Sequence, residues 1–372
     1  MSAKGTMLRR SLAALFVLWA LPPMATAADP PLFASDEVME LALTIDFDDL
    51  CRPRESDECD FEATTMEYKD ASGDWRSLPI EVQIRGGWRS LARNCSAPLL
   101  WVRFDAEQAA GTPFEGQSLL PLTTHCGRGL SLDRSSKRAT RADYEQYLLR
   151  EYLGHLLYRR ITEFSVGVRL VRISYPDPDR SGRSALHYAF FAEHFDDLAA
   201  RTGSRRLPRG NFEPEKLDAQ SAATLALFQF MIGNTDWSIA RERNTALLIK
   251  DGLHIPVPYD LDMSGLVDAS YAGPAVGLPI DSVRQRYFLG YCQPGTDWER
   301  VFARFAELQS ALLSLPAEIP GFSRKSLKST SGFLEKFFET IAVREAREDC
   351  IVRHCQPWPP AAEDHTSRRG TR

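Results

Sequence analysis

Strict alternation of apolar and polar side chains in the first third of the chain constrains the fold most. In residues 38–47, every second side chain from Met39 to Phe47 is apolar, and most of those between are polar. Residues 78–84 repeat the alternation, and residues 99–105 form a further apolar run. A period of two is typical of strands that bury one face. The first third of the chain is therefore predicted to be mostly β.

The pattern becomes helical near residue 142. Apolar residues recur at helical spacing over residues 142–160, which predicts a helix. Two strand-like runs follow, over residues 165–175 and 184–193, joined by a turn rich in Pro, Asp and Gly. The remaining predicted elements are an apolar helix over 218–232, a hairpin formed by 245–249 and 253–259, and helices around 298–308 and 333–341.

The first 27 residues have the features of a secretory signal. Arg9 and Arg10 precede an apolar run over residues 11–21, and small residues end at Ala27. The run is too short to anchor a chain in a bilayer. We therefore expect an exported protein, periplasmic or secreted, with no membrane span in the mature chain.

The net charge of the chain limits the classes of partner that we expect. The chain has 50 acidic and 45 basic residues and a formal net charge of −5. A general nucleic-acid binder needs a basic excess to neutralise phosphates, so nucleic acid is not an expected partner. The Pro-rich, charged segment over residues 356–372 is predicted to be a disordered tail.

All seven cysteines follow residue 27, in the part where export would allow disulfides to persist. Seven is odd, so at least one is unpaired, and spacing alone does not fix the connectivity. Two short loops and one longer loop are candidates: Cys51 with Cys59, Cys350 with Cys355, and Cys95 with Cys126. A zinc site at Cys350, His354 and Cys355 lacks a fourth ligand, so a disulfide or a free thiol is the preferred interpretation.

Acidic and amide side chains follow the helix over 218–232 and flank the hairpin. Asp236 lies in the loop after the helix, Asn244 precedes the first strand, and Asp260 follows the second. Phosphoryl transfer uses an Asp to orient the nucleophile, and an Asn and an Asp to hold Mg²⁺ on the nucleotide phosphates. Taken singly, each of these short stretches is a common turn or strand end. Their order along the chain is that of protein kinases and favours a phosphotransferase site.

The residues GNTDWS at 233–238, Asn244 and VPYDLDMSGLV at 257–267 resemble the atypical kinase fold of the CotH spore-coat protein family. A more distant resemblance is to HipA-type kinases. The resemblance covers residues 80–292, and its specific part is confined to 233–262. It implies that Asp236 is catalytic and that Asn244, Asp260 and Asp262 bind the metal.

The resemblance also implies residues that contact the nucleotide. Glu193, at the end of a strand, would mark the hinge beside the nucleotide. Glu145 or Glu151, on the helix over 142–160, would pair with a basic group that anchors phosphate. The strand that should carry the family's lysine offers Arg103 instead, whose planar guanidinium also contacts phosphate.

These observations predict an α+β protein with a two-lobed protein kinase-like fold, a β-rich N-lobe over 28–193 and a mostly helical C-lobe over 194–355. The leading hypothesis is an exported, ATP-dependent, kinase-like protein that binds Mg²⁺ and ATP and phosphorylates a protein or cell-envelope substrate. The alternative, favoured by Arg103 in place of lysine, is a non-catalytic kinase-like module that binds or supports the envelope. A weaker option is a metal-dependent transferase or hydrolase that uses the acids without ATP.

Overall fold

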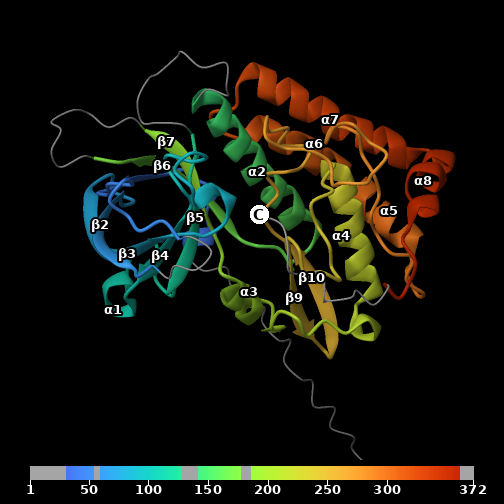
Figure 1. The fold of residues 1–372 in the computed structure, drawn as a ribbon, viewed down its shortest axis with the longest axis horizontal. Coiled ribbons are helices and arrows are strands. Elements are labelled where there is room, and N and C mark those ends of the chain that lie inside the picture. Colours follow the sequence, from blue (N-terminus) through green and yellow to red (C-terminus); the bar gives the residue numbers. More distant parts are fainter. Residues whose placement is uncertain (1–30, 54–58, 128–140, 177–185, 361–372) are drawn as a thin grey trace, which may run out of the picture.

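The computed structural model describes residues 31–53, 59–127, 141–176 and 186–360. The predicted signal over 1–27 lies outside the described residues, as does the predicted tail beyond 360. In Figure 1 a β-barrel built mainly from the first half of the chain stands beside a layer of helices from the second half. Helix α2 (Arg141–Ile161) lies between them.

Seven strands close into a barrel in the order β1-β2-β3-β4-β5-β7-β6. Their bounds are β1 Met39–Leu43, β2 Glu62–Lys69, β3 Trp75–Ile84, β4 Leu100–Phe104, β5 Leu119–Thr123, β6 Val168–Ser174 and β7 His187–Ala192. Strand β6 closes the barrel by pairing with β1 in parallel, and the other neighbouring pairs are antiparallel.

The alternation seen in the sequence decides which side chains fill the barrel. Leu78, Ile80 and Val82 of β3 point inward and are buried, while the residues between them are more exposed. Strands β6 and β7 are buried on both faces, since Phe191 packs inside the barrel and Phe190 packs against the helical core. A strand buried on both faces reads as a continuous apolar run, as the sequence of β7 does.

The two-lobed protein kinase-like fold predicted from the sequence is wrong. The β-rich part is a closed barrel of mixed strands, whereas a kinase N-lobe is an open sheet. Barrel closure depends on the pairing of Met39 with Val171 and of Ala42 with Ser174. These partners lie far apart in the sequence, so local periodicity did not indicate that the first predicted strand has a second neighbour.

The second half of the chain is mostly helical. Its helices are α3 Phe195–Arg201, α4 Ala219–Ile232, α5 Trp298–Glu307, α6 Gln309–Glu318, α7 Arg324–Ala342 and α8 Arg344–Cys350; the short α1 Ala106–Ala109 follows β4. A small sheet of β8 Arg205–Arg206, β9 Thr245–Lys250 and β10 Leu253–Pro258 has the order β10-β9-β8. Single 3₁₀ turns occur at Pro31–Phe33, Trp88–Ser90, Pro214–Lys216 and Val352–His354.

Helix α4 is the central element of this half. It is apolar on all sides and almost entirely buried, as expected of a helix surrounded by other elements. Asp218 caps its N-terminus by accepting a hydrogen bond from the amide of Ser221. Gly233 ends it in the left-handed conformation, with φ 64°. The predicted helix over 218–232 and the predicted hairpin are thus confirmed.

Three disulfides lie in the described residues: Cys51–Cys59, Cys95–Cys126 and Cys292–Cys355. The predicted pairing of Cys350 with Cys355 is wrong. Cys350 ends α8 as an exposed free thiol, while the amide of Cys292 donates to the carbonyl of Gln356 and brings Cys355 beside Cys292. Such disulfides are typical of exported proteins. No helix in the described ranges is long and apolar enough to cross a membrane.

Candidate functional site

The three polar residues that the sequence singled out around the hairpin meet in space. The Asn244 Nδ2 donates to the backbone oxygen of Asp236 at 2.7 Å and to its Oδ2 at 3.0 Å. The carbonyl of Asn244 accepts from the amide of Tyr259, which places Asp260 next to this pair. Asp236 and Asp260 line one cavity. The order of these residues along the chain therefore corresponds to a shared site.

Local backbone geometry explains why these residue types occupy these positions. Gly233 turns the chain out of α4, and the Asn234 Oδ1 accepts a hydrogen bond from the amide of Asp236 at 2.9 Å. Asn244 and Asp260 both have positive φ, 49° and 55°. Asn and Asp tolerate this left-handed conformation better than other side chains with a Cβ. The same residues that form the turns thus carry the polar groups of the site.

A guanidinium from the barrel occupies the centre of the acids. Arg89 lies in the 3₁₀ turn Trp88–Ser90, and its Nη2 donates to Oδ1 of Asp260 at 2.7 Å. Its Nη1 lies 3.6 Å from Oδ2 of Asp262 and 3.8 Å from Oε2 of Glu151. The Tyr271 hydroxyl donates to Asp262 at 3.1 Å. Three segments distant in sequence, around Arg89, Glu151 and residues 260–271, therefore converge on one charge network.

Burial and mutual repulsion shift the pKa values of this network. Burial raises the pKa of Glu151 and of Asp262, and the charge of Arg89 opposes both shifts. Burial by itself would lower the pKa of Arg89, but Asp262, Asp260 and Glu151 together raise it above the ordinary arginine value. Arg89 therefore stays charged, and its charge opposes the protonation of Glu151 and Asp262.

Asp236, the predicted catalytic residue, is partly buried and already engaged. Its carboxylate forms an ion pair with Arg243 in addition to the hydrogen bond from Asn244. Burial raises the pKa of Asp236, the positive charge of Arg243 opposes that shift, and the nearby Asp260 adds to it. A carboxylate that is oriented by an amide and has a raised pKa is suited to accept a proton from a hydroxyl.

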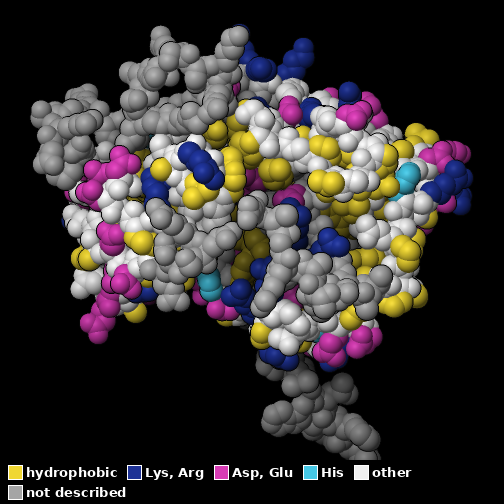
Figure 2. All heavy atoms as spheres, in the orientation of Figure 1, with side chains coloured by type: hydrophobic (Ala, Val, Ile, Leu, Met, Phe, Trp, Pro, Cys, Tyr) yellow, Lys and Arg dark blue, Asp and Glu magenta, His cyan; other side chains and the backbone are white. Residues whose placement is uncertain are grey.

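Two cavities meet at Arg85, Arg89 and Asp260, which line both. The first has a volume of about 420 Å³ and carries the acids Asp236 and Asp262. The second has a volume of about 330 Å³ and lies against the outer face of the barrel. Figure 2 shows hydrophobic and basic side chains gathered where the barrel meets the helical part.

The second cavity combines apolar and aromatic walls with charged side chains, among them Glu151, Glu193 and Arg206. Its walls come from the barrel, α2 and the chain on both sides of α3; they include Trp101, Val166, Phe190, Phe195 and Tyr259. Arg85 stacks over the Trp101 ring at 5.0 Å and forms no ion pair with a carboxylate in the described ranges. A concave chamber in which apolar walls meet convergent polar groups is the usual form of a small-molecule site.

Arg103, which the sequence predicted to contact the nucleotide, lies away from the acids of the cleft. Arg103 lies on β4 outside both cavities, where its Nη1 pairs with Glu81 at 2.9 Å and its guanidinium covers Phe61. The structure therefore does not bring Arg103 to the acids. Arg85 and Arg89, which the sequence analysis did not select, supply the guanidinium groups of the cleft.

Glu193 does line the second cavity, but its carboxylate has a structural role there. It accepts from the amide of Gly167 at 2.9 Å and from Nε and Nη2 of Arg201 at 2.9 and 2.8 Å. These bonds tie the end of β7 to α3 and to the start of β6. Glu151, by contrast, faces Arg89 from α2, in line with the pairing that the resemblance implied.

The residues that sequence reasoning missed carried a weak signal. Arg85 and Arg89 flank the Gly86-Gly87 pair at the end of β3, and a short Gly-rich turn is too common to indicate a site. His155 lies one turn after Glu151 on α2 and lines the second cavity. Burial lowers its pKa to about 4, so it is neutral near pH 7.

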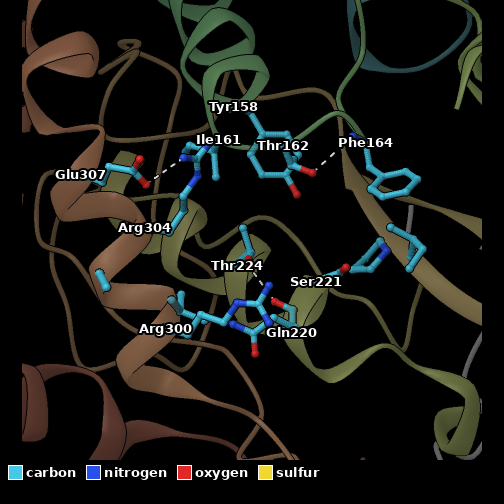
Figure 3. Close-up of a pocket in the computed structure, with 14 residues that line it drawn as sticks. Tyr158, Ile161, Thr162, Phe164, Gln220, Ser221, Thr224, Arg300, Arg304 and Glu307 are labelled. Atoms are coloured by element: carbon cyan, nitrogen blue, oxygen red, sulfur yellow. Dashed lines mark hydrogen bonds and ion pairs between the residues drawn. The ribbon is translucent and has the colours of Figure 1, made fainter. Parts of the chain in front are cut away.

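A larger cavity of about 580 Å³ lies elsewhere, between α2, α4 and α5 (Figure 3). Its charged side chains are Arg300, Arg304 and Glu307, and Arg304 pairs with Glu307 at 2.9 Å. The hydroxyl of Thr224 donates to the backbone of its own helix. This cavity has no convergent group of carboxylates, so the cleft around Arg89 is the stronger candidate site.

The acidic side chains of the cleft supply the type of ligand atom that a hard cation needs. Asp260 and Asp262 line the cleft with carboxylate oxygens of the type that Mg²⁺ prefers, whereas Asn244 is bound to Asp236 through its Nδ2 and is not among the described residues that line the cavity. Arg89 faces the same carboxylates, so a bound cation would share them with a guanidinium. In the described ranges no group of three His, Cys, Asp or Glu side chains is arranged as a metal site, including the zinc ligands considered near Cys355.

Comparisons with models of known protein families, with curated proteins and with solved structures give no match to this chain. The site therefore has to be interpreted from its own geometry and chemistry.

Proposed function

We propose that the cleft binds a magnesium–nucleotide complex and that the protein transfers a phosphoryl group to a protein or cell-envelope substrate. The observation that carries this proposal is the pair of cavities joined at Arg85, Arg89 and Asp260. The second chamber holds the aromatic side chains Trp101, Phe190 and Phe195 beside its charged groups, and the first holds the acids Asp236 and Asp262. A nucleotide has the same division between an apolar base and charged phosphates.

Each part of the cleft has a role in this proposal. Arg85 and Arg89 would contact the phosphates, and Asn244, Asp260 and Asp262 would hold Mg²⁺, which neutralises phosphate charge. Asp236 would accept the proton of an acceptor hydroxyl. The oxygen of that hydroxyl would attack the terminal phosphorus of ATP while the bond to the leaving ADP breaks. The resemblance of residues 233–262 to the CotH family is part of this proposal, because it implies the same roles for Asp236, Asn244 and Asp260.

A second candidate function is a non-catalytic module that binds a ligand in the same cleft. The ion pair between Arg243 and Asp236 favours it, because a paired carboxylate is less available as a base. The export predicted from the sequence and the three disulfides fit an envelope protein in either case.

Thermal unfolding of residues 28–372 with and without Mg-ATP tests the binding. A ligand at about 100 times its Kd stabilises the native state by roughly 2.7 kcal/mol, which raises the unfolding temperature measurably. We expect stabilisation only when Mg²⁺ and ATP are both present, and we expect Asp260→Asn to abolish it. Asp251→Asn is the matched control, because Asp251 has a similar φ of 52° in the turn between β9 and β10.

Phosphate transfer separates the two candidate functions. Incubation with γ-labelled ATP and an envelope protein fraction should give labelled protein with the wild type and not with Asp236→Asn. Binding of Mg-ATP without any transfer or hydrolysis would support the non-catalytic module. Equal thermal stabilisation of the wild type and Asp260→Asn would contradict the assignment of this cleft.

A further inference from the structure

A cavity of about 470 Å³ lies on the helical side of the molecule, away from the cleft. It is formed by α7 and by the chain between Val283 and Phe288, and it shares no residue with either chamber of the cleft. Five of its wall residues are cationic, and none is acidic: Arg284, Arg286, Lys325, Lys328 and Lys336. Figure 2 shows both basic and acidic side chains along the edge of the molecule above α7.

This concentration of positive charge departs from the composition of the chain. The sequence has eight lysines in 372 residues and an excess of acidic over basic residues. Three of the eight lysines nevertheless face this one cavity from a single helix. A solvated helix face normally intersperses both signs of charge. Helix α7 also carries the exposed acids Glu335 and Glu339, but the described residues that line the cavity include neither.

The two arginines are fixed in place by backbone carbonyls. The Arg284 Nη1 donates to the carbonyl of Gly265 at 2.8 Å, and the Arg286 Nε donates to the carbonyl of Met231 at 3.1 Å. Both guanidinium groups lie over the ring of Phe333, at 4.1 and 3.8 Å. Their positions are thus defined before any ligand arrives, which reduces the entropy lost on binding.

The five cations are not paired directly with carboxylates in the part of the chain that the structure describes. Within the described ranges, none of the five forms an ion pair with a carboxylate. Burial lowers the pKa of Arg286 to about 9, and the charge of Arg284 adds to that shift. Burial also lowers the pKa of Arg284, although Asp268 acts in the opposite direction. Mutual repulsion makes it unfavourable to hold like charges together in a partly buried position, and a bound anion would offset that repulsion.

We propose that this cavity binds a multiply charged tetrahedral anion, such as a diphosphate group. Two fixed arginines at the floor would take the anion by planar N–H contacts, and three exposed lysines at the rim would add charge. The group could belong to a free phosphorylated solute or to the headgroup of an anionic lipid. This inference does not rest on the function proposed for the cleft.

Isothermal titration with inorganic diphosphate in magnesium-free buffer tests the proposal on residues 28–372. We expect saturable binding that weakens at higher salt. Lys328→Glu should reduce the affinity at least about tenfold, because it reverses one charge at the rim of the cavity. The matched control is Arg324→Glu, since Arg324 is exposed on the same helix and does not line the cavity.

A second variant, Lys336→Glu, should reproduce the loss from a different turn of α7, which guards against a folding effect of the first. Arg85→Gln removes a guanidinium from the cleft and should leave diphosphate affinity unchanged. Absence of binding by the wild type would overturn the proposal. It would also be overturned if Lys328→Glu bound like Arg324→Glu, or if Arg85→Gln alone lost binding.

Vesicle sedimentation distinguishes the two sources of the anion. Stronger sedimentation with vesicles that contain phosphatidic acid, whose headgroup is a terminal phosphate, than with phosphatidylcholine vesicles, lost in Lys328→Glu, would assign the cavity to a lipid headgroup. Binding of free diphosphate without any difference between the vesicles would assign it to a soluble phosphorylated ligand. Both vesicle results support the anion site as long as diphosphate binds in the titration, and absence of diphosphate binding refutes it.

Discussion

At the scale of single residues, Arg89 determines the charge balance of the candidate site. It is the cation that faces Asp260, Asp262 and Glu151 together. We expect Arg89→Met to lower the free energy of unfolding by about 3–5 kcal/mol at pH 8, because it leaves buried carboxylates without their partner. Urea unfolding of the variant and the wild type measures this difference.

The loss should shrink as the pH falls. Glu151 and Asp262 have raised pKa values in the folded state, so the cost of keeping them ionised is greatest above those pKa values and disappears once they are protonated. The control is Arg103→Met, which breaks an exposed ion pair with Glu81 and should cost less than about 1 kcal/mol. Equal losses in the two variants would contradict the central role of Arg89.

His155 gives the protein an acid-sensitive position beside the same site. Burial lowers its folded pKa to about 4, whereas an unfolded histidine titrates near 6.5. Its contribution to stability is therefore complete above pH 6.5 and is lost as the pH falls toward 4. We expect the wild type to lose about 2 kcal/mol more than His155→Gln between pH 7 and pH 5. Urea unfolding at the two pH values measures it.

The exposed His354 provides the comparison for this pH effect. His354→Gln should keep the pH dependence of the wild type, because that side chain is not buried in the core. If His155→Gln showed the same loss between pH 7 and pH 5 as the wild type, the burial of a neutral His155 would be refuted.

At the scale of elements, close backbone contacts hold the acid-bearing loop against α7. A Cβ on Gly265 would lie 2.2 Å from the carbonyl oxygen of Val283 and 3.0 Å from the ring of Phe333. Gly332, on α7, has open space at the same position and a helical conformation. We expect Gly265→Ala to destabilise the protein by about 2 kcal/mol or more through overpacking. Gly332→Ala should stabilise it by about 0.5–1 kcal/mol.

Thermal unfolding of the two variants checks this pair of opposite effects. Gly265→Ala should also weaken any ligand binding in the cleft, because Gly265 follows Asp262 and Met263 in the same loop. A neutral Gly265→Ala would show that the loop is not held against Val283 as described.

The elements that local pattern predicted are those with a strong period. Helices α2 and α4 and the β9–β10 hairpin appear where the sequence placed them, since each has a continuous apolar repeat or a clear turn signal. Strand β2 was missed because it buries only Met66 and Tyr68, and β5 because it is short and contains Pro121. Their strand conformation depends on neighbours in the barrel, which a local window does not contain.

At the scale of the whole molecule, the sequence indicated the acids and the amide of the candidate site but not its arginine. Asp236, Asn244 and Asp260 lie within one continuous stretch, so their order was informative. Arg89 arrives from the barrel, 171 residues before Asp260 in the chain. The contact between them depends on how the barrel packs against the helical part, and the parallel pairing that closes the barrel has the same long-range character. Neither contact leaves a periodic trace in the sequence.

The disulfide between Cys292 and Cys355 is a covalent link of similarly long range. It closes a loop with a sequence separation of 63 residues. It ties the segment that follows α8 to the segment that precedes α5. The chain-entropy model assigns such a loop about 4 kcal/mol of stabilisation. We expect the double variant Cys292→Ala, Cys355→Ala to lose an amount of this order in urea unfolding, and Cys350→Ser to lose almost nothing because that thiol is free and exposed. Peptide mapping without reduction should recover Cys292 linked to Cys355; recovery of Cys350 linked to Cys355 would contradict the structure and restore the pairing that short loop length favoured.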